Sequence, residues 1–127
     1  MRIYCTTCSR KKLQTKEPVR AIDLYLSENI RRVYSKSLID GLDFRILSGK
    51  FGLLSPDDKV RSYDYLLREE GVDSLKGKLR IQIKSQEIDG ITFFAEDRTT
   101  HPNWGPYYDA ITGVCKELNI NLELIVI

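Results

Sequence analysis

Side chains that can bind charged groups gather first in residues 6–12, directly after a short apolar run. This stretch offers hydroxyls, a thiol and three consecutive cations. Hydroxyls donate hydrogen bonds to phosphate oxygens, and Lys and Arg neutralise the phosphate charge. The GxxxxGK[ST] spacing of a Walker loop is absent. We therefore predict a phosphate-binding loop of another kind, or else a solvated loop with ordinary surface charges. Its candidate binding residues are Cys8, Ser9, Arg10, Lys11 and Lys12.

A glycine-bearing stretch, residues 48–58, is the second candidate. Its two glycines stand three apart with a lysine between them, and glycine lets the backbone turn tightly or approach a ligand closely. The alternative is a plain turn that leads into a short helix. The predicted binding residues of this stretch are Ser48, Gly49, Lys50 and Gly52.

Two carboxylates and a phenol follow these glycines and are candidates for acid–base chemistry. Asp57 stands in a Pro-Asp turn signal, and Tyr63 and Asp64 come soon after it. A carboxylate stabilises a cationic transition state, and a phenol donates a proton or a hydrogen bond. Structural roles compete with this interpretation: Tyr63 packed in the core, and Asp57 or Asp64 tied to a cation or a helix N-terminus.

The third polar stretch, residues 96–106, carries the only histidine and the only tryptophan of the chain. His101 is a candidate proton donor. Trp104, with Tyr107 and Tyr108 close behind it, is a candidate platform on which a nucleobase stacks. Alternatively, these aromatic rings only close the end of a sheet.

The three cysteines are an odd number, which fits reduced thiols better than a disulfide framework. Cys5 and Cys8 form a CxxC, but a metal would need further ligands, and only Cys115 and His101 are available. We therefore predict one core thiol and one loop thiol, with neither a metal nor a cofactor. Because the first residues hold too short an apolar run for a signal peptide and no run approaches a membrane span, we expect a cytoplasmic protein with no membrane contact.

Charge is distributed unevenly along the chain. Residues 1–36 carry nine Lys or Arg against three Asp or Glu, although the whole chain has a net charge of only +2. A basic N-terminal third attracts phosphate-bearing partners. The expected partner is therefore a nucleotide or a nucleic acid, DNA or RNA.

Alternating apolar runs and amphipathic segments predict a three-layer α/β/α domain over residues 1–127, with a small, mainly parallel four-stranded sheet. The expected strands are residues 3–6, 44–47, 91–95 and 122–127. The expected helices are residues 19–33, which Ser27 would split if it caps a second helix, and residues 63–70, 74–88 and 106–118.

Ligands of such sheets bind outside the carboxyl ends of the strands, where the polar loops lie. We therefore expect one cleft there, with a tetrahedral anion held by the first loop and the Gly49–Gly52 backbone. The residues expected to converge on the cleft are Ser9, Arg10, Lys11, Lys12, Ser48, Lys50, Asp57, Tyr63 and Asp64.

Four segments within residues 3–67 together resemble an uncharacterised bacterial and archaeal family, known as a domain of unknown function. They are Cys-Ser-Arg-Lys-Lys at 8–12, Ala-Ile-Asp-Leu-Tyr at 21–25, Leu-Ser-Gly-Lys-Phe-Gly-Leu-Leu-Ser-Pro-Asp at 47–57, and Tyr-Asp at 63–64. The third segment is also similar to a motif of YaaA-type peroxide-stress proteins, which are associated with DNA binding. The layout is distantly similar to a middle domain of archaeosine synthases and to uracil-DNA-glycosylase-like folds.

These resemblances imply a nucleic-acid or nucleobase theme without supplying a reaction. His101-Pro102-Asn103 resembles the His-Pro motif of uracil-DNA glycosylases, but their Gly-Gln-Asp-Pro-Tyr loop is absent. The leading hypothesis is a nucleotide- or nucleic-acid-binding domain. One alternative is an enzyme acting on a nucleobase or an N-glycosidic bond. The other is a protein-interaction domain without a small ligand, which an exposed apolar patch away from the cleft would favour.

Overall fold

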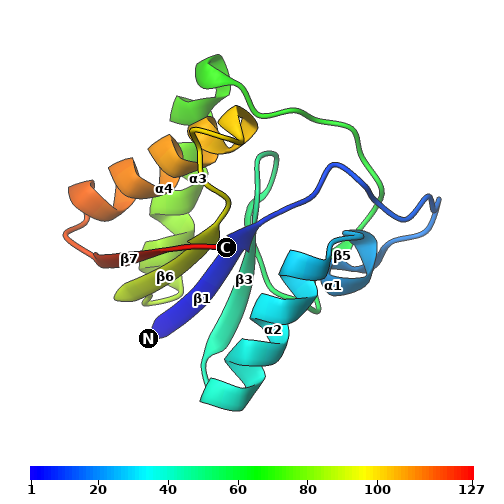
Figure 1. Cartoon of the computed structure of the whole chain (residues 1–127), viewed down its shortest axis with the longest axis horizontal. Coiled ribbons are helices and arrows are strands. Elements are labelled where there is room, and N and C mark those ends of the chain that lie inside the picture. Colours follow the sequence, from blue (N-terminus) through cyan, green and yellow to red (C-terminus); the bar gives the residue numbers. More distant parts are fainter.

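A five-stranded sheet with the order β4-β3-β1-β6-β7 forms the middle of the computed structural model, which describes all residues 1–127 (Figure 1). Four of its strands run parallel, and the short β4 pairs antiparallel with β3 through a hairpin. The mainly parallel sheet is confirmed, but it has five strands because the glycine-bearing loop continues into β4. The strands are β1 (Arg2–Thr7), β3 (Asp43–Ser48), β4 (Gly52–Leu54), β6 (Gly90–Ala95) and β7 (Asn121–Val126).

Helices cover both faces of this sheet, which confirms the three-layer arrangement (Figure 1). The short α1 (Ala21–Leu24) and the long α2 (Glu28–Asp40) pack on one face. On the other face lie α3 (Val72–Ser85) and α4 (Gly105–Glu117), which also pack against each other. No helix has the length and apolar composition that crossing a membrane would require.

Two apolar clusters, one on each side of the sheet, form the core. Successive side chains of a strand point to opposite faces, so Ile3 and Cys5 of β1 join the α3–α4 side while Tyr4 packs on the α2 side. All six residues of β6 are buried, as expected for a strand covered on both faces.

The segment expected as one helix over residues 19–33 is divided into three elements. Val19 and Arg20 form β2 (Val19–Arg20), which pairs antiparallel with β5 (Lys59–Val60) in a separate two-stranded sheet. The chain then turns through α1 and enters α2, whose first turn is capped by Ser27: its Oγ accepts a hydrogen bond from the Ile30 N–H. The division at Ser27 is confirmed, whereas α2 continues to Asp40, beyond the predicted end.

The prediction of a short helix over residues 63–70 is wrong. Residues 61–68 have no regular structure, and only the single 3₁₀ turn η1 (Glu69–Gly71) follows them. Contacts distant in sequence decide this conformation, because Leu67 is buried in the core and the Tyr63 hydroxyl is bonded to two other elements. The expected helices over residues 74–88 and 106–118 are confirmed as α3 and α4.

The β4 edge of the sheet is closed by one side chain from α3. Gln82 Oε1 accepts a hydrogen bond from the Leu53 N–H at 2.8 Å, and its Nε2 donates to the Phe51 carbonyl at 3.1 Å. Gly52 starts β4 with a φ of +77°, and a Cβ at this position would meet the same Gln82 amide. The hairpin therefore requires a residue without a side chain at position 52.

We predict that Gly52→Ala destabilises the protein by about 1–3 kcal/mol, because the left-handed backbone is strained for alanine and the Gln82 contacts must shift. Gly77 is the matched control: it lies inside α3 with no atom within 4 Å of an added Cβ. Gly77→Ala should therefore stabilise the protein by about 0.5–1 kcal/mol. Urea denaturation of the two variants measures both changes, and equal effects of the same sign would contradict this account.

Candidate functional site

A pocket of about 640 Å³ opens beyond the carboxyl end of β1. Its wall combines the loop after β1, the start of α2, the irregular segment 61–68, and η2 (Pro102–Trp104) with the start of α4. The lining residues are Thr7, Cys8, Ser9, Arg10, Lys12, Ser27, Asn29, Asp64, Tyr65, Leu66, Asn103, Trp104 and Tyr107. Segments distant in the sequence therefore meet at one end of the sheet.

The structure brings six of the predicted site residues into this lining: Cys8, Ser9, Arg10, Lys12, Asp64 and Trp104. Three more, Ser48, Lys50 and Tyr63, form a layer next to Lys12. The predicted site residues that do not line the pocket and do not belong to this layer are Lys11, Gly49, Gly52, Asp57 and His101. The expected convergence on one cleft is therefore partial.

The Tyr63 hydroxyl is the centre of the layer next to the pocket. It lies 2.6 Å from the Tyr25 hydroxyl and 2.8 Å from Ser48 Oγ, so it ties segment 61–68 to α1 and β3. Lys12 Nζ and Lys50 Nζ lie 4.6 Å and 5.4 Å from the centre of the Tyr63 ring. Cations within about 6 Å of an aromatic ring are attracted to its π face. Tyr63 thus brings together two cations from two different loops.

The backbone of the glycine-bearing loop is not free to hold an anion as expected. Ser48 Oγ accepts hydrogen bonds from the N–H groups of Lys50 and Phe51, at 3.2 Å and 3.1 Å. The hydroxyl of Ser9 is also engaged, because it donates to the Lys11 carbonyl at 2.8 Å. Side-chain cations, rather than a cradle of N–H groups, are the donors that remain for an anion.

Cys8 lies in the pocket wall with its sulfur 3.5 Å from the Tyr107 hydroxyl. Burial, followed by the nearby Cys8, raises the pKa of Tyr107, so this phenol stays protonated near neutral pH. Cys5, by contrast, is fully buried in β1, and burial raises the pKa of its thiol. All three cysteines are free thiols, and no three His, Cys, Asp or Glu side chains are grouped as metal ligands.

Asp57 is placed away from the pocket and is bound by a cation. Arg20 Nη2 and Nε lie 2.8 Å and 2.9 Å from the same carboxylate oxygen. This pair joins the β2–β5 sheet to the loop before β5, which is the structural role that competed with catalysis in the sequence. Asp64, which lines the pocket, forms no ion pair.

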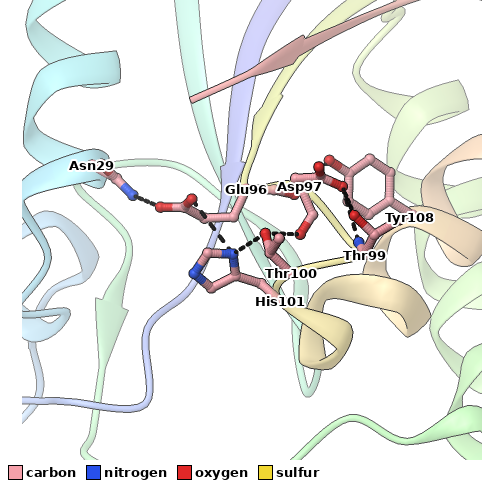
Figure 2. Close-up of polar contacts among 7 residues, drawn as sticks. All are labelled: Asn29, Glu96, Asp97, Thr99, Thr100, His101 and Tyr108. Carbon is pink, nitrogen blue, oxygen red and sulfur yellow. Dashed lines mark hydrogen bonds and ion pairs between the residues drawn. The ribbon is translucent and has the colours of Figure 1, made fainter.

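His101 takes part in a chain of polar contacts in the loop that leads to the pocket residue Asn103 (Figure 2). Asn29 Nδ2 donates to Glu96 Oε1 at 3.0 Å, and Glu96 Oε2 lies 3.8 Å from His101 Nδ1. The Thr100 hydroxyl is 3.0 Å from the same ring nitrogen. Because Asn29 also lines the pocket, this chain of contacts links the start of α2 to the loop after β6.

A tight turn holds the loop that carries His101 (Figure 2). The Asp97 carboxylate accepts hydrogen bonds from the Thr99 N–H and hydroxyl, both at 2.9 Å, and these bonds lower the pKa of Asp97. The Tyr108 hydroxyl donates to the Glu96 carbonyl at 2.7 Å. The start of the loop is therefore fixed by its own polar groups and by Tyr108 of α4.

Sequence reasoning missed several residues of the pocket wall. The sequence pattern predicts a helix at Tyr65 and Leu66, and it therefore gives no sign of their place in an irregular wall segment. Asn29 belongs to the first turn of a helix and carries no motif signal of its own. The one sequence signal for Tyr107 is its position close to Trp104, as a second aromatic ring of the same stretch.

The fold places this protein among the α/β proteins, and the pocket lies at the carboxyl end of the sheet, where ligands of open sheets usually bind. The chain belongs to a family of unknown function, DUF6884, whose model matches residues 3–101. No curated protein and no solved structure matches the chain. The matched region includes the loop after β1, the β3–β4 hairpin and segment 61–68.

Alkaline pH should destabilise the fold through Tyr63. Burial, followed by the nearby Cys8, raises the pKa of this phenol to about 12, so above pH 10 the unfolded chain loses this proton before the folded chain does. The contribution is fully present below about pH 10 and is lost as pH rises towards 12. Urea denaturation across this range should show a fall in unfolding free energy that is shallower by about one proton in Tyr63→Phe. An unchanged slope in the variant would refute the assignment to Tyr63.

Proposed function

We propose that the pocket binds a nucleotide, either free or as part of a nucleic acid. The observation that carries this proposal is the composition of the pocket wall, in which Arg10 and Lys12 stand with the aromatic rings of Tyr65, Trp104 and Tyr107. A nucleotide presents the matching pair of groups, an anionic phosphate and a flat base. The volume of about 640 Å³ lies within the range of about 300–1,000 Å³ typical of small-molecule sites.

The cations of the pocket are available for a phosphate. Neither Arg10 nor Lys12 forms an ion pair with a side chain of the protein, and Lys11 and Lys50 next to them are also free of acidic partners. An Arg and a Lys without acidic partners on one wall neutralise a phosphate without first breaking an ion pair. Phosphate binding therefore takes place on the side of the loop after β1.

Aromatic rings supply the other half of the recognition. Trp104 and Tyr107 stand at the start of α4, and Tyr65 comes from segment 61–68. Stacking on such rings tolerates any base, since every base has a π face. The resemblance of residues 47–57 to YaaA-type proteins, and of the layout to glycosylase-like folds, supports the same theme.

We predict that Arg10→Glu weakens mononucleotide binding by about tenfold or more, because it replaces a charge-assisted hydrogen bond with repulsion. The wild-type affinity should fall as salt rises, and the variant should lose part of that dependence. Lys78→Glu is the matched control, since Lys78 is an exposed cation of α3 without an acidic partner. Isothermal titration at several salt concentrations makes the comparison.

The contribution of stacking to nucleotide binding can be measured separately from the contribution of charge. Trp104→Ala should cost about 1–3 kcal/mol of binding free energy while leaving the salt dependence unchanged. Nucleotide affinity that ignores salt and survives both changes would exclude the proposed mode of binding. Binding of inorganic phosphate alone, unaffected by Trp104→Ala, would show an anion site without base recognition.

A second candidate, an enzyme that acts on a nucleobase or an N-glycosidic bond, is favoured by one specific observation. Asp64 is a carboxylate in the wall of the same pocket, and the Glu96–His101 pair belongs to the loop that leads into that wall at Trp104. A carboxylate near a departing base stabilises positive charge on the sugar, and a nearby proton donor assists the leaving group. Tyr63 holds segment 61–68, which carries Asp64, in place rather than facing the pocket itself.

Two isosteric variants separate catalysis from structure. Asp64→Asn should lower turnover on the order of 100-fold or more, because the developing positive charge loses its partner. Asp57→Asn is the control, since Asp57 is engaged by Arg20 outside the pocket and its loss should leave turnover unchanged. Base release from a panel of nucleosides and single-stranded nucleic acids is the measurement. Equal turnover in both variants would remove Asp64 from the reaction, and no turnover in the wild type would leave the binding function alone.

A further inference from the structure

The two edges of the sheet differ in a way that points to a partner. The β4 edge is only three residues long, and the Gln82 amide occupies its backbone groups. The β7 edge is six residues long and pairs with β6 alone, so its outer row of N–H and C=O groups has no partner in the chain. Open edges of this length pair with other chains unless a sequence feature prevents it.

β7 carries only one such feature, a single charge. Natural edge strands are protected by lysines, prolines, bulges or inward-pointing charges. β7 instead exposes apolar side chains: Leu124 is 49% exposed and Val126 is 65% exposed. Its only charge, Glu123, lies 3.5 Å from the Arg2 guanidinium, which reduces its repulsion of an approaching strand. The strand is built like one that is covered by another strand.

We propose that β7 pairs antiparallel with β7 of a second copy of this chain, so that two sheets join into one. A strand that adds to this edge must itself have a free edge. The other edge of the five-stranded sheet is occupied by Gln82, and the strands of the β2–β5 sheet are only two residues long. Pairing of β7 with β7 around a two-fold axis is the closed arrangement that remains, and it gives a dimer rather than a fibre.

The side-chain pattern of β7 selects the register of this pairing. With the two-fold axis at Leu124, Leu124 faces its own copy and Leu122 faces Val126, so apolar side chains on the α4 side of the sheet cover one another. With the axis at Glu123, two like charges would stand directly opposite each other, which is destabilising. With the axis at Ile125, Leu122 would stand opposite no residue of the other copy's β7. We therefore assign the axis to Leu124.

Antiparallel pairing also fixes where the two pockets lie. The parallel strands of the two copies run in opposite directions, so their carboxyl ends, and with them the pockets, lie at opposite ends of the joined sheet. No residue of β7 lines the pocket. The dimer therefore holds two independent sites, and breaking it leaves nucleotide binding unchanged.

A cysteine cross-link tests both the dimer and its register. At the two-fold axis, the Cα atoms of an antiparallel pair lie about 4.5–5.5 Å apart. That separation is within the span of about 4.4–6.8 Å that disulfides bridge. In a Cys8→Ser background, which removes the one thiol that is not buried, Leu124→Cys should form a covalent dimer under mild oxidation. Glu123→Cys, moved off the axis, should cross-link much less, and equal cross-linking of the two would overturn the register.

Mass measurement tests the dimer without oxidation. Light scattering over a concentration series should approach twice the chain mass of 14.7 kDa for the wild type. Leu124→Lys should give a folded monomer with the circular dichroism spectrum of the wild type, and Ile81→Lys, at an exposed apolar position of α3, should remain a dimer. A wild type that stays monomeric at every concentration, or that grows beyond a dimer, would overturn the proposal. So would a Leu124→Lys protein that keeps the wild-type mass, because the contact would then lie elsewhere.

Discussion

Parallel pairing of β1 with both β3 and β6 is the constraint on which the rest of the molecule depends. Parallel neighbours cannot be joined by tight turns, so each connection must cross a face of the sheet and carry a helix there. The same pairing places the carboxyl ends of β1, β3 and β6 at one end of the sheet. The loops that leave these strands therefore meet, although more than about forty residues of sequence separate each loop from the next. The pocket therefore results from the topology of the sheet first, and from individual sequence motifs only second.

Segment 61–68 completes the pocket because two side chains hold it while its backbone stays irregular. Tyr63 is bonded to Ser48 and Tyr25, and Leu67 is buried against the α3–α4 core. Between these two anchors, residues 64–66 are presented to the pocket as one wall. Gly49 explains why the wall lies so close to the β3–β4 hairpin, because a Cβ there would come within 2.9 Å of Leu67 Cβ.

The sequence sufficed for the elements that periodicity defines, and it failed where a single distant contact decides the conformation. The four long strands and the helices α3 and α4 follow from apolar runs and amphipathic spacing. Segment 61–68 has a helical pattern as well, but the hydroxyl bonds of Tyr63 and the burial of Leu67 override it. The β2–β5 pairing and the Gln82 contacts with β4 join residues far apart in sequence, and no local signal announces either. The same holds for the candidate site: the sequence indicates the loop after β1 as part of it, but it does not indicate Asn29 or Tyr65.

Charge is the property in which sequence and structure differ most instructively. Arg20 lies among the N-terminal cations, yet Asp57 and Asp23 occupy its guanidinium. Asp57 stands in a motif that suggests function, and the same pair commits it to structure. Arg10 and Lys12, by contrast, stay unpaired at the pocket, and the Tyr63 ring keeps Lys12 and Lys50 near each other without neutralising either. An aromatic ring attracts a cation but leaves its charge available, whereas a carboxylate cancels it. The positive charge at the pocket therefore depends on which cations pack on aromatic rings and which form ion pairs with carboxylates. These pairings are decided only when the chain folds.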